Sequence, residues 1–191
     1  MPLTVLDVSP ALILVDLQAG ARRPGAEFSA VVDNAARLAD AFRSRGFAVA
    51  LVNVAGGAPG RTDVSAARSS RARRERTEGW TDLLPELGSA ENDILITKSR
   101  WGAFHDTALD QELRSRGVTQ VVLGGVATSI GVESTARAAY EHGYDVVLAT
   151  DAMFDSHADS HVNSIQRIFP RLGETTTTPL LVDALNGVAP A

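Results

Sequence analysis

The sequence of 191 residues contains no cysteine. This absence excludes disulfide bonds, iron–sulfur clusters, zinc sites built from thiolates and a catalytic thiolate. Long apolar runs are also missing, since none approaches the roughly 18 residues needed to cross a bilayer, and the opening MPLTVLDVSP has no basic region of the kind that begins an export signal. We therefore expect a cytoplasmic protein without a membrane partner.

Lysine is also scarce, and the chain has no excess of positive charge. Lys98 is the single lysine among 18 basic residues, and all the others are arginine. This bias suggests that position 98 needs a compact ammonium on a flexible stem, although chance retention of one lysine is the alternative. With 23 acidic residues the formal charge is −5, which argues against nucleic acid as a partner and leaves a small molecule.

Length and composition fit one globular domain spanning residues 1–191, with 45% hydrophobic and 21% charged residues. Several short apolar runs are too continuous for half-exposed strands, so they predict strands buried on both faces, as in a parallel sheet. These runs are 11–17, 47–54, 93–98, 119–127 and 145–150.

Predicted helices separate the strands. One spans 29–45, with Ser29 as its N-cap, and a capping box of Thr107 and Asp110 opens another that ends at Gly117. The joints RSRG-FAVALV, RSRG-VTQVVL and YEHG-YDVVLA each place a glycine between a helix and a strand, which predicts an α/β fold with a doubly wound sheet. The segment 55–91 shows no convincing strand, and its basic run Arg71–Arg76 belongs either to an active-site lid or to a solvated surface connection.

Polar residues follow three of the predicted strands. Asp16 ends the first and Lys98 the third, while Thr128, Ser129 and Gly131 occupy the turn after the fourth. Ligands of open parallel sheets bind beyond the carboxyl ends of the strands, so these residues can meet in one pocket.

Three blocks of the sequence carry a family resemblance: ALILVDLQ (11–18), ITKSRWGAF (96–104) and GGVATSIGVESTARAAYEHGYDVVLATDAM (124–153). The chain resembles the isochorismatase-like hydrolases, a superfamily that includes nicotinamidases and N-carbamoylsarcosine amidases. The resemblance implies a three-layer α/β/α sandwich around a mostly parallel six-stranded sheet, with an Asp, Lys and Cys triad. Asp16 and Lys98 match the first two triad positions, and Gly131 stands at the third.

The glycine at 131 changes the expected chemistry. Amidases of the superfamily form an acyl-enzyme on the thiolate, a route closed to a chain without cysteine, and neither Ser129 nor Ser134 matches the nucleophile position. The isochorismatase branch has glycine there, which implies that protonated Asp16 cleaves an enolpyruvyl ether to pyruvate and a dihydrodiol. The alternatives are a hydrolase that uses Asp16-activated water on another small molecule, and an inactive binding member of the family.

The expected acid role of Asp16 sets two effects against each other. The ammonium of Lys98, which would orient Asp16 or pair with a substrate carboxylate, favours the ionised carboxylate, whereas a dry pocket favours the acid. The resemblance further implies a cis peptide between Val126 and Ala127 that would turn backbone N–H groups near Gly131 toward the ligand. Expected substrate-binding residues are Gln18, Trp101, Phe104, Val126, Ala127, Thr128 and Ser129, with a plain loop role open for Gln18 and core packing for Trp101 and Phe104.

No metal or other cofactor is expected. Asp155, His157 and His161 have a spacing that metal ligands could use, but they follow the fifth strand, away from the position of the nicotinamidase metal site. The resemblance implies a homodimer or homotetramer, with Ala136, Ala139 and Tyr140 as candidate contacts.

Overall fold

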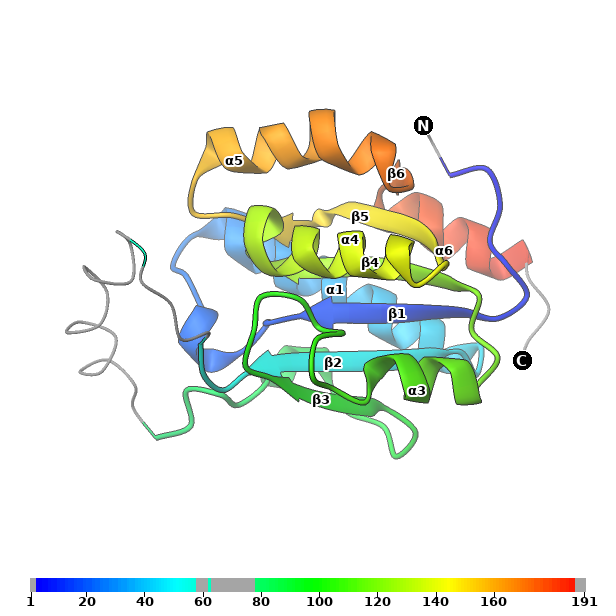
Figure 1. Cartoon of the computed structure of the whole chain (residues 1–191), viewed down its shortest axis with the longest axis horizontal. Coiled ribbons are helices and arrows are strands. Elements are labelled where there is room, and N and C mark those ends of the chain that lie inside the picture. The colour runs from blue at the N-terminus through cyan, green and yellow to red at the C-terminus, as the bar shows by residue number, and fades with distance from the viewer. Residues whose placement is uncertain (1–2, 58–61, 63–77, 188–191) are drawn as a thin grey trace.

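A computed structural model of the chain describes residues 3–57, 62 and 78–187. Its centre is a six-stranded sheet in the order β3-β2-β1-β4-β5-β6, in which all neighbouring strands are parallel (Figure 1). The strands are β1 (Pro10–Val15), β2 (Ala48–Val54), β3 (Ile94–Lys98), β4 (Gln120–Val126), β5 (Asp145–Phe154) and β6 (Glu174–Thr176).

The central strands are buried on both faces, as their unbroken apolar runs predict. Every residue of β1 and β4 is buried. Because successive side chains of a strand point to opposite faces, Leu12 and Leu14 join the hydrophobic cluster on one face, while Ile13 and Val15 join the cluster on the other. The sheet therefore needs a helical layer on each face.

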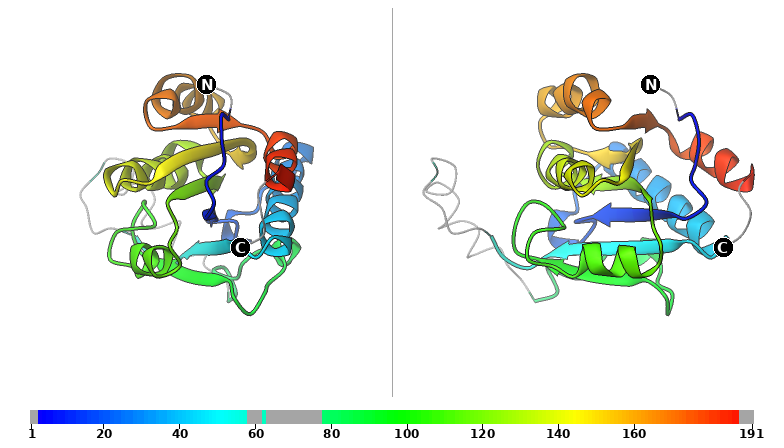
Figure 2. Two further views of the ribbon diagram at one scale, coloured as in Figure 1. Left: turned by 90° about the vertical axis from the view of Figure 1, so that its right-hand side faces the viewer. Right: turned by 45° about the vertical axis from the view of Figure 1, so that its right-hand side comes forward.

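Helices cover both faces of the sheet (Figure 2). The first layer contains α1 (Ala26–Ser44) and α6 (Thr178–Gly187), and the second contains α3 (Leu109–Ser115), α4 (Glu133–Glu141) and α5 (Ala158–Asn163). Short helical turns lie at Ala19–Ala21, Pro85–Leu87, Thr128–Val132, Ser164–Ile168 and Phe169–Arg171. This three-layer arrangement confirms the predicted α/β fold.

The predicted helix-to-strand joints are confirmed by their backbone. Gly46, Gly117 and Gly143 have φ angles of 76°, 65° and 81°. These values lie in the left-handed region that glycine enters without steric cost, so each helix can end there and the next strand can begin at once.

Both predicted helix starts are wrong. Helix α1 begins at Ala26 after Gly25, and Ser29 lies inside it, where its hydroxyl donates to the Gly25 carbonyl at 3.2 Å. The Thr107 hydroxyl donates to the carbonyl of Ala103 and accepts the Leu109 N–H at 3.3 Å, whereas Asp110 accepts a hydrogen bond from the Tyr144 hydroxyl. A local bond therefore uses the Thr107 hydroxyl and a tertiary contact uses the Asp110 carboxylate, both of which the capping box would have needed.

Several other boundaries differ from the prediction. Strand β1 stops at Val15, before Asp16, and β5 continues to Phe154 past an irregular register opposite β4. Strand β6 has the sequence ETT, which carries no apolar signal, so only the family resemblance anticipated a sixth strand.

In the segment 55–91, the part that the structure describes contains the turn Pro85–Leu87 and an isolated bridge between Leu83 and Gln18, but no strand. The run Arg71–Arg76 lies outside the described residues. No helix within the described ranges is both long and apolar enough to cross a membrane. Ala136 and Ala139 are buried against the sheet, which corrects their placement as contact residues, while Tyr140 is exposed.

Candidate active site

A buried ion pair joins the ends of two strands. The Lys98 ammonium donates to Asp16 Oδ2 at 2.7 Å, and the side chains are only 2% and 12% exposed. Lys98 ends β3 and Asp16 follows β1, so β2 lies between them and their backbones are about 10 Å apart at the usual strand spacing. The long lysine stem spans this gap, which gives a physical reason for lysine at position 98.

Asp16 leaves the strand with an unusual backbone. Its φ is 55°, in the left-handed region that residues with a side chain rarely adopt. Two backbone hydrogen bonds hold it there: its N–H donates to the Val52 carbonyl at 2.7 Å, and its carbonyl accepts the Gln18 N–H at 2.9 Å. Observed outliers of this kind gather at functional sites, where the surrounding structure enforces them.

Burial and charge act on the Asp16 carboxyl in opposite directions. Burial is the larger effect and raises its pKa to about 6, although the charge of Lys98 and the hydrogen bond from it lower the pKa. In addition, the buried Oδ1 atom has no hydrogen-bond partner within the described residues. Asp16 can therefore carry a proton below about pH 6 on an oxygen that has no competing partner among the described residues.

Gly131 completes the site because it lies tightly against this carboxyl. A Cβ at position 131 would lie 3.2 Å from Asp16 Oδ2, and 3.1 Å from both the Val126 carbonyl oxygen and Val15 Cγ1. The structure thus brings Asp16, Lys98 and Gly131 together, and hydrogen is the side chain that fits position 131 without displacing its neighbours.

The turn that carries Gly131 is held from the segment after β5. The peptide bond between Val126 and Ala127 is cis, as the resemblance implies, and a helical turn runs from Thr128 to Val132. Asp155 Oδ2 accepts the Ser129 N–H at 2.9 Å and the Ser129 hydroxyl at 2.6 Å. Sequence reasoning weighed Asp155 only as a metal ligand and missed this role.

The hydrogen bonds of Asp155 also favour its ionised form. Burial raises its pKa, but the side-chain and backbone hydrogen bonds from Ser129 and the backbone N–H of His157 together lower the pKa below its usual value. His161 faces the same turn, since its Nδ1 lies 2.9 Å from the Thr128 hydroxyl. Within the described ranges no group of three or more His, Asp or Glu residues could hold a metal ion.

The structure places three of the expected substrate-binding residues differently from the prediction: Gln18, Phe104 and Trp101. The Gln18 amide donates to the carbonyls of Val54 and Trp80 at 3.2 and 3.1 Å and accepts the Val54 N–H at 2.7 Å, so it joins backbone segments instead of facing Asp16. Phe104 is buried and stacks on His142 at 5.1 Å, which makes it a core residue.

Trp101 lies on the surface, 65% exposed, and is neither packed in the core nor enclosed in a pocket. Val126 and Thr128 are buried beside Gly131, and Ala127 is partly buried between them. The Ser129 hydroxyl donates to Asp155.

Comparisons with known proteins agree with this geometry. The isochorismatase domain family matches residues 10–179. An uncharacterized isochorismatase family protein of Bacillus subtilis, YwoC, is 40% identical over 170 residues, which cover 88% of this chain and 89% of the relative. The solved structure of an isochorismatase family protein from Burkholderia thailandensis superposes with a TM-score of 0.83 at 36% identity, covering 95% of this chain and 98% of the other.

A further relative is named for an amide substrate. The ureidoacrylate amidohydrolase RutB of Variovorax paradoxus is 31% identical over 180 residues, which cover 79% of this chain and 71% of the relative. Similarity at this level therefore extends to proteins with a different named reaction, and the residues of the site must decide the chemistry.

Proposed function

From the premise that this chain belongs to the isochorismatase family of hydrolases, we propose that it cleaves an enolpyruvyl ether with Asp16 as general acid. Isochorismate, which would yield pyruvate and a dihydrodiol, is the substrate to test first. One observation carries the proposal: the position against the Asp16 carboxyl is Gly131, which has no nucleophilic side chain, in a chain that has no thiol. A covalent acyl intermediate on cysteine is therefore unavailable, and proton transfer is the chemistry that remains.

The reaction begins with Asp16 in its acid form, which burial favours near neutral pH. Asp16 donates its proton to the terminal carbon of the enolpyruvyl group, and the carbon bearing the ether oxygen becomes an oxocarbenium centre. A water molecule adds to this centre and returns a proton to the Asp16 carboxylate. The resulting hemiketal then breaks its C–O bond while its hydroxyl proton passes to the leaving oxygen, through the Asp16 carboxyl, which releases pyruvate and the alcohol.

Lys98 and Gly131 support this step in different ways. The ammonium, 2.7 Å from Asp16 Oδ2, stabilises the carboxylate that forms when the proton leaves. Gly131 places no nucleophile beside the carboxyl, so proton transfer from Asp16 meets no competing covalent step. Together they explain how a weak acid beside a cation can both give up and recover a proton.

A second candidate is hydrolysis of an amide by water that ionised Asp16 activates. The similarity to a ureidoacrylate amidohydrolase supports it, and so does the Lys98 ammonium, which favours the ionised carboxylate. The two candidates require opposite protonation states of the same residue.

Release of pyruvate from isochorismate by the purified protein, followed with a coupled dehydrogenase, tests the first candidate. We expect Asp16→Asn to lower the rate by about 10²- to 10⁴-fold, the range typical of a general acid. Asp33→Asn, a matched change on the exposed face of α1, should leave the rate unchanged. No pyruvate from the wild type, or full activity of Asp16→Asn, would overturn the proposal.

A further inference from the structure

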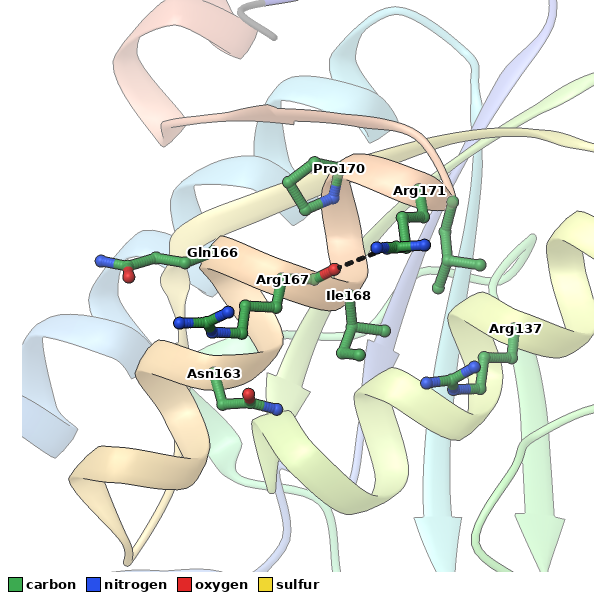
Figure 3. A pocket seen from close by; sticks show the side chains of 8 residues that line it. Arg137, Asn163, Gln166, Arg167, Ile168, Pro170 and Arg171 are labelled. Carbon is green, nitrogen blue, oxygen red and sulfur yellow. Dashed lines mark hydrogen bonds between the residues drawn. The ribbon is translucent and has the colours of Figure 1, made fainter.

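A hollow of about 610 Å³ lies between α4 and the segment that follows α5 (Figure 3). Its volume is within the roughly 300–1,000 Å³ of small-molecule sites. It shares no residue with the Asp16 site, so neither the family resemblance nor the proposed reaction accounts for it. The lining residues are Arg137, Asn163, Gln166, Arg167, Ile168, Pro170, Arg171 and Leu172.

The charges of this lining are all of one sign. Three arginines contribute to it and no carboxylate does, although the whole chain has a formal charge of −5. Arg137 comes from α4, while Arg167 and Arg171 come from the other wall. Guanidinium groups therefore border the hollow on both sides (Figure 3). An arrangement of this kind attracts anions and repels cations.

The three guanidinium groups differ in the ion pairs and hydrogen bonds that they already make within the protein. Arg137 is paired with Glu133 at 2.9 Å, which partly neutralises it. Arg171 uses its Nε to donate to the Arg167 carbonyl at 3.2 Å, a bond that fixes the side chain without cancelling its charge. The guanidinium of Arg167 makes no hydrogen bond or ion pair with any residue in the described part of the chain. Arg167 and Arg171 therefore offer the donors available to a ligand.

The rest of the lining indicates an organic ligand. Ile168, Pro170 and Leu172 provide apolar surface, and the amides of Asn163 and Gln166 can both donate and accept hydrogen bonds. A planar guanidinium binds phosphate or carboxylate oxygens in pairs. We propose that this hollow binds a small organic molecule that carries two or more phosphate or carboxylate groups.

Isothermal titration of the full chain with inorganic pyrophosphate and, separately, with citrate tests this site and distinguishes a phosphate from a carboxylate ligand. We expect one of the two probes to bind the wild type, and the double variant Arg167→Gln, Arg171→Gln to bind it at least about tenfold more weakly. The matched control is Arg37→Gln, an exposed arginine of α1 on the opposite face of the sheet, which should bind as the wild type does.

The outcomes separate a built site from general charge attraction. Loss of binding in the double variant alone, with circular dichroism and thermal unfolding like those of the wild type, supports the proposal. The proposal is overturned if neither probe binds at millimolar concentration. It is also overturned if the Arg37→Gln control weakens binding as much as the double variant, because the attraction would then come from overall charge.

Discussion

At the scale of single residues, the chemistry of the site depends on the pKa of the Asp16 carboxyl, which burial raises and the neighbouring Lys98 charge lowers. An exposed aspartate beside an ammonium would be ionised at neutral pH and could not donate a proton. In this chain burial exceeds the effect of Lys98, and the pKa of Asp16 rises to about 6. The same carboxyl would serve as an acid below that pH and as a base above it.

The pH dependence of kcat/KM therefore distinguishes the two candidate reactions. If Asp16 is the general acid, activity should be highest below pH 6 and fall about tenfold per pH unit above it, because the protonated fraction falls in that proportion. If Asp16 is a general base, activity should instead be lost as the pH falls through 6. A profile flat from pH 5 to 8 would contradict both roles.

Replacing Lys98 tests the electrostatic half of this balance. Lys98→Met keeps a long apolar stem but removes the charge and the hydrogen bond that lower the pKa of Asp16. We expect the alkaline limb of the pH profile to move above pH 6 while kcat falls, because the carboxylate formed after proton transfer loses its partner. An unshifted limb would show that Lys98 acts on the substrate instead.

Gly131→Ala tests the space beside the carboxyl. The added Cβ would approach three neighbours at 3.1 to 3.2 Å, so we expect a loss of about 1–3 kcal/mol in the free energy of unfolding and a loss of activity. Gly57→Ala is the control, because a Cβ there meets nothing within 4 Å. Urea denaturation of both variants measures the difference, and equal stability would indicate that position 131 has room to spare.

At the scale of elements, the turn Thr128–Val132 depends on a segment distant from it in sequence. Asp155 follows β5 and accepts two hydrogen bonds from Ser129. It thereby fixes the chain two residues before Gly131, so the site is shaped by the end of β5 as well as by its own strands.

Asp155→Ala should release this turn. We expect a loss of about 1–3 kcal/mol of stability, because the partly buried Ser129 donors lose their acceptor, together with a fall in kcat. Asp159→Ala, an exposed position of α5, is the matched change and should have little effect on either quantity. Parallel denaturation and rate measurements check both, and a stable but inactive Asp155→Ala variant would point to a direct contact with substrate.

Elements with a strong local signal could be predicted from the sequence. The buried strands and the glycine joints were, because apolar runs and left-handed glycines are properties of short segments. Helix starts were not, since Ser29 and Thr107 donate to the carbonyl four residues earlier, a local alternative to capping that residue type alone does not reveal. Strand β6 pairs with β5 through its backbone and needs no apolar run.

The sequence was enough to name the residues of the candidate site, but not the contacts between them. Asp16, Lys98 and Gly131 were found because each follows a predicted strand and matches a family position. The 2.7 Å contact between Asp16 and Lys98 depends on the strand order, which places β2 between them. The role of Gln18 stayed open from the sequence because its partners, the backbone groups of Val54 and Trp80, lie far away in sequence.

At the scale of the whole molecule, the two proposed sites use different parts of the fold. The Asp16 site lies at the carboxyl ends of β1 and β3, where loops from several strands converge. The arginine-lined hollow lies in the helical layer of α4, outside the sheet. Substrate chemistry and anion binding can therefore be altered separately.

The assembly state can be measured on the same preparations. The family resemblance leads us to expect a homodimer or homotetramer, and the exposed side chains of Leu95, Trp101 and Tyr140 offer apolar surface for contacts. Light scattering coupled to size-exclusion chromatography should give two or four times the chain mass of 20.1 kDa. A mass equal to one chain at micromolar concentration would contradict this expectation.

The Gln18 amide concentrates several backbone contacts in one buried side chain. It donates to the carbonyls of both Val54 and Trp80 and accepts the Val54 N–H, beside the strand ends that carry Asp16 and Lys98. A single substitution at position 18 would therefore leave backbone groups of two separate segments without their partner at the same time.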